Sequence, residues 1–191
     1  MNTEIQTYKG NLFDFLNPKA EAVDIGDVAH ALSNICRYNG HTKQFYSVAE
    51  HCVRASFIPI GNPLINLLHD SAEAYIGDIP TPQKKKLCWW EDGIKIPIQN
   101  IEIRVLNAIG HRLGIRGLSV KIGTIDTKKA DRIMLATEVR DLMGDSTAFQ
   151  EWIKDIEPLA HRIEPWYPVQ AESEFLNRYY ELRKYCKGTV Q

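Results

Sequence analysis

The chain has 191 residues, 44% hydrophobic and 25% charged, which is typical of one soluble globular domain and not of a fibrous or disordered protein. Its 23 basic and 24 acidic residues leave a formal net charge of −1, so no overall field favours nucleic acid or an anionic membrane. No apolar run approaches the ~20 residues that a membrane span needs. The cysteines form no Cys-x-x-Cys pair and follow no secretory leader, so we expect a cytoplasmic protein without nucleic-acid or membrane partners.

The first half of the chain predicts an extended arm followed by three helices. Residues 1–23 form the arm and contain no candidate site residue. A first helix is expected from Asp27, as its N-cap, to Arg37, and Asn39-Gly40 ends it. Two further helices are expected, one opened by the capping box Ser47-Val-Ala-Glu50 and one continuous central helix from Asn62-Pro63 to Gly77.

The second half is expected to be helical as well. An amphipathic helix is predicted for residues 97–113 and another, capped by Thr127, up to Met143, with a loop or short extended piece at 115–126. Proline steps break residues 145–168 into turns and short helices. Because strand signals are almost absent, we predict an all-α helical bundle. It is expected to be one domain, 1–191, with a core of about 25–143 and a C-terminal helix 168–186 packed on it.

Residues 67–82, LLHDSAEAYIGDIPTP, carry the strongest chemical signal. On a helix, His69 and Asp70 leave adjacent sides of one turn, and Glu73 lies one turn further on. Apolar residues surround all three, which predicts a buried helix. Buried carboxylates without partners cost several kcal/mol, so a metal cation is the simplest compensation. Two prolines after Asp78 hold residues 78–82 extended, and we call this segment the lip.

Two more residues complete a pattern that occurs in a known family. His51, His69-Asp70 and Asp131, in this order and on three predicted helices, resemble the His…His-Asp…Asp ligands of the HD-domain metal-dependent phosphohydrolases. The resemblance covers residues 25–143 and implies that these four residues hold a divalent metal ion in an HD-domain helical bundle. Two imidazoles and two carboxylates suit Mn²⁺, Co²⁺, Zn²⁺ or Fe²⁺ better than Ca²⁺, and a polyphosphate substrate could bring Mg²⁺ in addition.

Within that family, the run His-Asp-x-x-Glu-x-x-x-x-Asp-Ile-Pro-Thr-Pro resembles the 5′-deoxynucleotidases. Residues 32–41 resemble small phage- and prophage-encoded members, some of which remove phosphates from deoxyadenosine triphosphate. We therefore expect an enzyme that removes phosphate from small-molecule 5′-deoxynucleotides, as monophosphates or stepwise from dATP and other dNTPs, and that forms a homo-oligomer. The alternatives are an HD-type phosphodiesterase or alarmone hydrolase, and a nucleotide-binding regulator in which the metal site is structural.

The resemblance also assigns roles around the metal. Glu73 would take a proton from water and return one to the leaving 5′ oxygen, provided that burial raises its pKa. Arg37 would hold the substrate phosphate through its planar guanidinium, and Tyr38 stands where 5′-deoxynucleotidases usually carry Trp. Asp78 would bond the sugar 3′-hydroxyl. The remaining substrate-binding candidates are Ile79, Pro80 and Thr81 of the lip, which would shape the base pocket, and His41, with a structural loop role as its alternative.

Several residues have other interpretations. Glu73 could be the ion-pair partner of a Lys or Arg. The run Lys84-Lys85-Lys86 could steer an anionic substrate, but so short a charge run is more typical of a solvated face. We expect Glu138 to belong mainly to an ion-pair cluster with neighbouring charges on its helix, and ordering of a metal ligand is its second candidate role. The Trp89-Trp90 pair is expected to be core or an oligomer contact.

Overall fold

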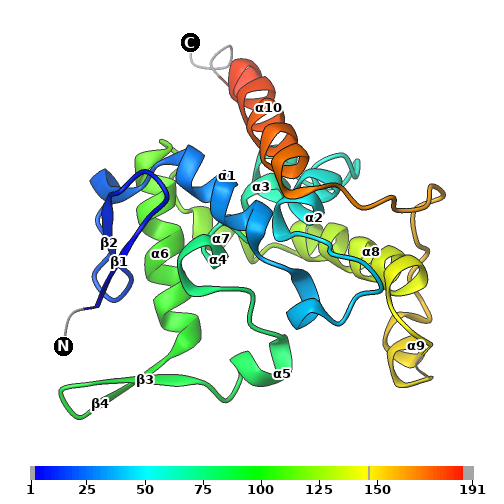
Figure 1. Cartoon of the computed structure of the whole chain (residues 1–191), viewed down its shortest axis with the longest axis horizontal. Coiled ribbons are helices and arrows are strands. Elements are labelled where there is room, and N and C mark those ends of the chain that lie inside the picture. The colour runs from blue at the N-terminus through cyan, green and yellow to red at the C-terminus, as the bar shows by residue number, and fades with distance from the viewer. Residues whose placement is uncertain (1–2, 146, 187–191) are drawn as a thin grey trace.

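Helices form most of the chain, as its apolar periodicity predicts. The computed structural model describes residues 3–145 and 147–186 (Figure 1). The 3₁₀ segments η1 (Ala20–Ala22) and η2 (Arg37–Gly40) flank the first helix. The helices are α1 (Ile25–Asn34), α2 (Val48–Ala55), α3 (Pro63–Leu68), α4 (Glu73–Ile76), α5 (Thr81–Lys84), α6 (Ile98–Arg112), α7 (Leu118–Ile122), α8 (Ile125–Leu142), α9 (Thr147–Ile153) and α10 (Pro168–Cys186).

Two antiparallel hairpins correct the all-α prediction. β1 (Glu4–Gln6) pairs with β2 (Leu12–Asp14), and β3 (Cys88–Glu91) pairs with β4 (Ile94–Pro97). The second hairpin turns at Asp92-Gly93, whose φ angles of 48° and 79° give the two-residue turn that matches the twist of paired strands. This Asp-Gly step between apolar runs is the sequence signal for the hairpin. Trp89 and Trp90 lie on β3 and are exposed, so they do not belong to the core.

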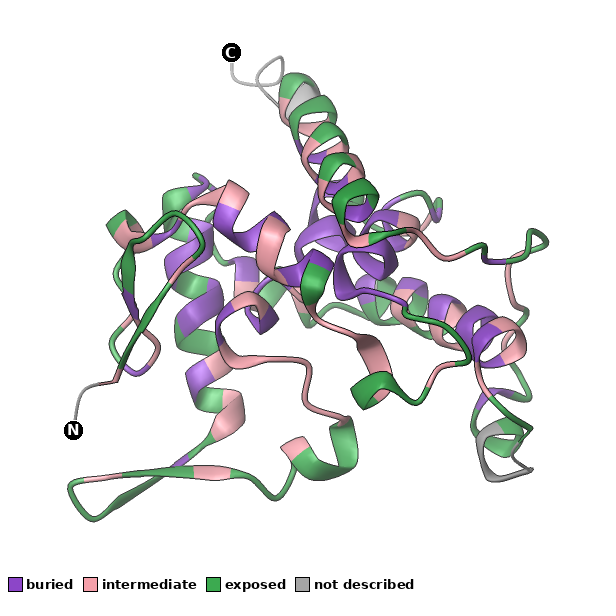
Figure 2. Cartoon of the chain, viewed as in Figure 1, coloured by how far each residue is buried: buried purple, intermediate pink, exposed green. Residues whose placement is uncertain are grey.

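The main hydrophobic core lies where α1, α2, α3 and α10 meet. Fully buried apolar side chains come from each of them, including Val28, Cys52, Leu67 and Phe175. Helix α10 contacts the other three, and Figure 2 shows the buried residues concentrated in this region while exposed residues cover the outer helix faces. The core thus fixes α2 and α3, the two helices closest in sequence to the predicted metal ligands His51 and His69.

The first helix begins earlier than predicted. Asp24, not Asp27, is its N-cap, because the Asp24 carboxylate accepts hydrogen bonds from the backbone N–H groups of Gly26 and Asp27. Asp27 is buried instead, and its carboxylate accepts hydrogen bonds from Thr7 and Lys9 in the N-terminal hairpin. Asp27, the predicted cap, therefore attaches the N-terminal hairpin to α1.

Helix α1 also ends earlier than predicted, at Asn34 and not at Arg37. The chain then turns through η2, where Tyr38 and Asn39 have φ angles of 56° and 51°. Left-handed backbone at residues other than glycine is uncommon and costs about 1–3 kcal/mol, so the surrounding contacts must hold it. The turn carries Arg37 and Tyr38 away from α1 to Glu138 on α8.

The central helix predicted between Asn62 and Gly77 is two helices, α3 and α4. Both predicted ends are correct. The Asn62 side chain accepts hydrogen bonds from the backbone N–H groups of Leu64 and Ile65, and Gly77 ends α4 with a φ of 79°. The predicted helix is wrong only in its interior. The break covers residues 69–72 and so includes His69 and Asp70.

A side chain explains the break. His69 Nδ1 donates a hydrogen bond to the carbonyl oxygen of Asn66 at 2.7 Å. The next turn is tight, because Ser71 N–H bonds to the oxygen of Leu68 and Glu73 N–H to that of Asp70, contacts three residues apart where an α-helix has four. His69 and Asp70 leave adjacent sides of this turn, and yet His69 Nε2 and Asp70 Oδ2 lie 3.1 Å and 3.6 Å from the same atom, His51 Nε2.

Residues 115–126, predicted as a loop or extended piece, contain the short helix α7. Glycines at 114 and 117, with φ of 67° and 66°, allow the turns that bury Leu118 against α6. Helix α8 follows directly and begins at Ile125, before the predicted cap Thr127, which is buried inside it. Asp131 and Glu138 then lie two turns apart on α8.

Candidate metal centre

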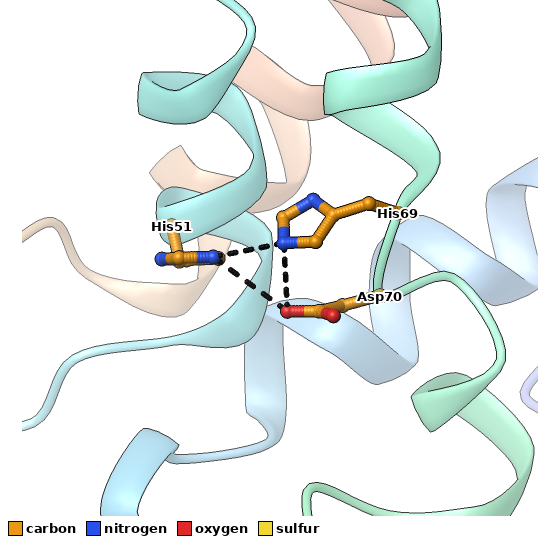
Figure 3. Close-up of side chains that lie close together, drawn as sticks. All are labelled: His51, His69 and Asp70. Carbon is orange, nitrogen blue, oxygen red and sulfur yellow. Dashed lines mark hydrogen bonds and ion pairs between the residues drawn. The ribbon is translucent and has the colours of Figure 1, made fainter. Parts of the chain in front are cut away.

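Three segments distant in sequence bring His51, His69, Asp70 and Asp131 together. His51 lies in the first turns of α2, where the predicted cap forms: the Ser47 hydroxyl accepts a hydrogen bond from Glu50 N–H. His69 and Asp70 follow α3, and Asp131 projects from α8. Figure 3 shows His51 on α2 pointing toward His69 and Asp70, which lie together on the segment after α3.

Three of the four predicted ligands, His51, His69 and Asp70, have ligand atoms within 4.8 Å of one another, and Asp131 lies outside this group. His51 Nε2 and His69 Nε2 are 3.1 Å apart, and Asp70 Oδ2 lies 3.6 Å from the first and 3.2 Å from the second. These three atoms form a group that could hold a metal ion. Asp131 Oδ1 lies 3.2 Å from His51 Nε2 and 3.7 Å from His69 Nε2, so the fourth predicted ligand adjoins the same two nitrogens.

The outer nitrogens of both rings are already committed as donors. His51 Nδ1 lies 2.5 Å from Glu138 Oε1, and His69 Nδ1 bonds to the carbonyl oxygen of Asn66. Both partners are acceptors, which assigns the Nδ1–H tautomer to each neutral ring and leaves a lone pair on each Nε2. Two lone pairs 3.1 Å apart repel one another unless a cation lies between them. With these tautomers, the two Nε2 atoms can bind a proton or a metal ion between them.

The pKa shifts of His51, His69 and Asp70 also favour a cation between the two rings. Burial and Arg37 act to lower the pKa of His51, but the carboxylates of Glu138 and Asp131 outweigh them and raise it. Burial also opposes charge on His69, whose pKa is nevertheless raised by Asp70 and Asp131. The pKa of Asp70 is correspondingly low, because His69, His51 and Arg37 overcome the cost of its burial. These shifts favour a positive charge at the two Nε2 atoms.

Metal affinity is therefore expected to fall with decreasing pH. Protons and metal ions compete for the same Nε2 lone pairs, and the folded-state pKa values of both histidines lie above the ordinary value of 6.5. Lowering the pH through those values returns the protons and displaces the metal. Chelator-competition titrations at about pH 6, 7 and 8 should give a dissociation constant that decreases as pH rises. An affinity independent of pH over this range would show that the imidazoles are not ligands.

Glu138 organises the side of the centre that faces away from the cavity. It is fully buried and accepts a hydrogen bond from Tyr38 Oη at 2.5 Å in addition to its contact with His51, and Arg37 Nε lies 3.3 Å away. Burial raises the pKa of a carboxyl, but Arg37 and His51 dominate and lower that of Glu138. Its predicted pairing with neighbouring charges is wrong, because Arg140 and Asp141 pair with each other. The second candidate role of Glu138, ordering the metal ligand His51, stays a prediction.

Glu138→Gln is expected to weaken metal binding by about 10- to 100-fold, because a neutral amide holds the His51 ring less firmly and makes its Nε2 a poorer ligand. Asp141→Asn is the matched control. Asp141 is a buried carboxylate on the same helix, but it pairs with Arg140 and Arg162. Both variants should be compared by metal titration. Equal affinities for Glu138→Gln and the unaltered protein would contradict the ordering role.

A cavity of about 610 Å³ adjoins the centre. His51 and His69 are buried behind it. The predicted metal ligands Asp70 and Asp131 line it, and so does each predicted catalytic or substrate-binding residue: Arg37, Tyr38, His41, Glu73, Asp78, Ile79, Pro80 and Thr81. A larger cavity, about 980 Å³, lies at the start of α3 and α8 and contains none of them. The chemistry of its lining makes the smaller cavity the candidate site.

Glu73 is buried at the start of α4, and its Oε2 has no hydrogen-bond partner among the described residues. Burial raises the pKa of Glu73 well above its ordinary value, and the carboxylates of Asp70 and Asp78 raise it further. Lys84 Nζ lies 3.9 Å from Glu73 Oε1 but 2.9 Å from Glu102, which is its closer partner. Glu73 therefore combines a raised pKa with one oxygen left for another group.

Three other predicted site residues line the cavity: Tyr38 and His41 from η2 and its end, and Asp78 from the lip. Tyr38 lines the cavity, while its hydroxyl is held by Glu138. Burial raises the pKa of Asp78, which lies at the start of the lip, although Arg37 opposes the shift. His41 lies at the end of η2 on the cavity wall. The structure thus places the predicted phosphate, sugar and base contacts around one space.

Sequence reasoning missed several cavity residues. Lys84, predicted as part of a solvated face, has a side chain only 18% exposed, lines the cavity and is fixed by Glu102 and by a hydrogen bond from Gln99 to its carbonyl. Its position two residues after Pro82, which ends the run that resembles the 5′-deoxynucleotidases, was the available signal. Leu135, Met143 and Trp152 form another part of the lining and carry no motif.

No helix in the described ranges, 3–145 and 147–186, combines the length and apolarity that crossing a membrane requires. No family model matches the chain. The chain is 33% identical over 185 residues to the uncharacterized protein YfdR of Escherichia coli, which covers 96% of this chain and 97% of YfdR. It is 28% identical over 195 residues to the uncharacterized protein RCAP_rcc00048 of Rhodobacter capsulatus, covering 94% and 95% of the two chains. The identity and the nearly complete coverage show that the chain belongs to the same family as YfdR.

Proposed function

We propose that this protein is a metal-dependent phosphohydrolase of the HD-domain type that removes phosphate from 5′-deoxynucleotides. The observation that carries the proposal is the convergence of two imidazole Nε2 atoms with the carboxylates of Asp70 and Asp131 beside a cavity lined by Glu73 and Arg37. Metal ligands, a proton-transfer group and a fixed cation are the parts that hydrolysis of a phosphate ester requires.

The residues fit a divalent cation. Asp70, Glu73, Asp78 and Asp131 line the cavity, where Arg37 and Lys84 are the fixed cations, so the lining carries excess negative charge. His51, His69, Asp70 and Asp131 would hold the metal, and Mn²⁺, Co²⁺ or Zn²⁺ suits this mixture of nitrogen and oxygen ligands. When bound, such a cation supplies Lewis acidity, which lowers the pKa of water and polarises a phosphoryl group. It also offsets the repulsion between the carboxylates and an anionic substrate.

Glu73 would carry the proton. Its raised pKa brings it closer to neutral pH, where a carboxyl exchanges protons most effectively, and its Oε2 faces no competing donor in the described part of the chain. Glu73 takes a proton from the attacking water and then donates one to the 5′ oxygen as the phosphorus–oxygen bond breaks. From a deoxynucleoside monophosphate, the products are inorganic phosphate and a deoxynucleoside with its 5′-hydroxyl.

Arg37 would bind the phosphate. Its guanidinium lies at the metal end of the cavity, with Nη1 3.2 Å from Asp70 Oδ2, and its side chain is 12% exposed. Glu138 fixes the opposite side of the guanidinium, so its remaining N–H groups are available to phosphate oxygens. Asp78, on the lining of the same cavity, would accept the sugar 3′-hydroxyl, a group that deoxyribose retains.

Phosphate release from a panel of dNMPs, dNDPs and dNTPs, each with Mn²⁺, Co²⁺ or Mg²⁺, tests the proposal. Release from at least one nucleotide, dependent on metal, is the expected result. The same panel should include cyclic nucleotides and guanosine alarmones. Cleavage of those compounds alone would keep the hydrolase and change its substrate, whereas tight nucleotide binding with no release from any compound would favour a regulator and refute the hydrolase.

A further inference from the structure

The cavity has an apolar wall that none of the proposed chemistry uses. Leu135 and Met143, from α8 and its end, line it together with Trp152 of α9. Scattered exposed apolar residues need no explanation, but these three meet in one cavity. Trp152 lines the cavity and is 61% exposed.

The apolar residues of the lip line the same cavity from another part of the chain. Ile79 and Pro80 lie between α4 and α5, whereas Pro82 lies in the first turn of α5. The predicted extended geometry of residues 78–82 is therefore wrong from Thr81 on, because a proline in the first turn of a helix is tolerated. The lip therefore lines one part of the cavity, and Leu135, Met143 and Trp152 of α8–α9 line another. Figure 1 shows α5, which follows the lip, and α9 as separate parts of the fold. Its volume of about 610 Å³ falls in the range of small-molecule sites.

The polar and apolar residues of the lining require different parts of a ligand. Asp70, Asp131, Arg37 and Glu73 suit a phosphate and a metal, but neither group gains from contact with Leu135, Met143 or Trp152. A molecule that satisfies the whole cavity carries an anionic group at one end and a planar apolar group at the other. A nucleobase attached through a sugar to a phosphate has this form, and its flat face suits an indole ring.

We propose that Trp152, supported by Leu135 and Met143, is the stacking surface for the base of the substrate. This inference rests on the proposed function, since it assumes that a nucleotide occupies the cavity. It adds a base-binding surface on α8–α9 to the base contacts predicted for the lip. The base packs on Trp152 while the 5′ phosphate lies at the metal end beside Arg37.

The decisive comparison uses a substrate that lacks a base. Trp152→Ala is expected to raise the KM for the best deoxynucleotide by about 10- to 100-fold. Its kcat/KM for 2-deoxyribose 5-phosphate, which has the same sugar and phosphate, should stay unchanged. Trp152→Phe should restore most of the nucleotide affinity, because a phenyl ring also stacks. Trp90→Ala is the matched control: Trp90 is 66% exposed on β3 and does not line the cavity, so its loss should leave KM unchanged.

Intrinsic fluorescence gives a second measurement that needs no turnover. Titration with an unphosphorylated deoxynucleoside should quench emission in the unaltered protein and in Trp90→Phe, and the quenching should disappear in Trp152→Phe. Equal losses of activity toward the deoxynucleotide and deoxyribose phosphate, or no loss for either, would overturn the base contact while the hydrolase stands. If no phosphate is released from any compound, the proposed function fails. The fluorescence then decides: quenching specific to Trp152 supports the base contact, and its absence overturns it.

Discussion

Replacing Glu73 with Gln is expected to lower kcat for phosphate release by about 10²- to 10⁴-fold, the usual contribution of a general acid–base group. Gln preserves the volume of the buried side chain but cannot exchange a proton. Metal content and metal affinity should remain unchanged, since Glu73 lies outside the group of candidate ligand residues His51, His69 and Asp70. Initial rates at saturating nucleotide, together with metal analysis of the same sample, provide the measurement.

Variants at Lys84 and Glu102 separate proton transfer from the alternative ion-pair role of Glu73. If Glu73 served only as a partner of Lys84, Lys84→Met would reduce both kcat and the thermal midpoint as much as Glu73→Gln does. Glu102→Gln removes the closer partner of Lys84 without changing Glu73, and controls for the loss of a carboxylate nearby. A Glu73→Gln protein that kept most of its kcat would exclude Glu73 as the proton carrier.

Asp70→Ala is expected to abolish both metal binding and turnover. Asp70 Oδ2 lies 3.2 Å from His69 Nε2 and from Arg37 Nη1, so its loss removes a candidate ligand and the partner of the cation proposed to bind phosphate. Removing one partner of a buried ion pair also costs about 3–5 kcal/mol, because the other charge is left uncompensated. Metal occupancy after dialysis and phosphate release, measured on one preparation, should both fall to background.

The loss of Asp70 must be distinguished from unfolding. Asp70→Asn keeps the side-chain volume and an oxygen that can accept from Arg37, so it should remain folded by circular dichroism while binding metal far more weakly. Asp126→Ala is the matched control, because Asp126 is an exposed carboxylate on α8 and should alter neither property. Full metal occupancy in folded Asp70→Asn and Asp70→Ala would remove Asp70 from the ligand set.

Local signals in the sequence were sufficient for several structural predictions. Ser47 caps α2, Asn62 caps α3 and Gly77 ends α4, as predicted. Each device joins atoms only a few residues apart, so it operates whatever the rest of the chain does. The cap predicted at Asp27 is wrong because a tertiary contact holds the Asp27 carboxylate on the N-terminal hairpin, and Asp24 caps the helix instead.

The sequence by itself determined the identity and order of the candidate ligands, His51, His69, Asp70 and Asp131, and the helices or helix ends on which they lie. Only the tertiary structure decided how they meet. Glu138 on α8 contacts His51 on α2, 87 residues away in the sequence. Lys84 turns to Glu102, away from solvent. These contacts depend on which helix faces pack together, and hydrophobic periodicity records that a face is buried without recording which partner covers it.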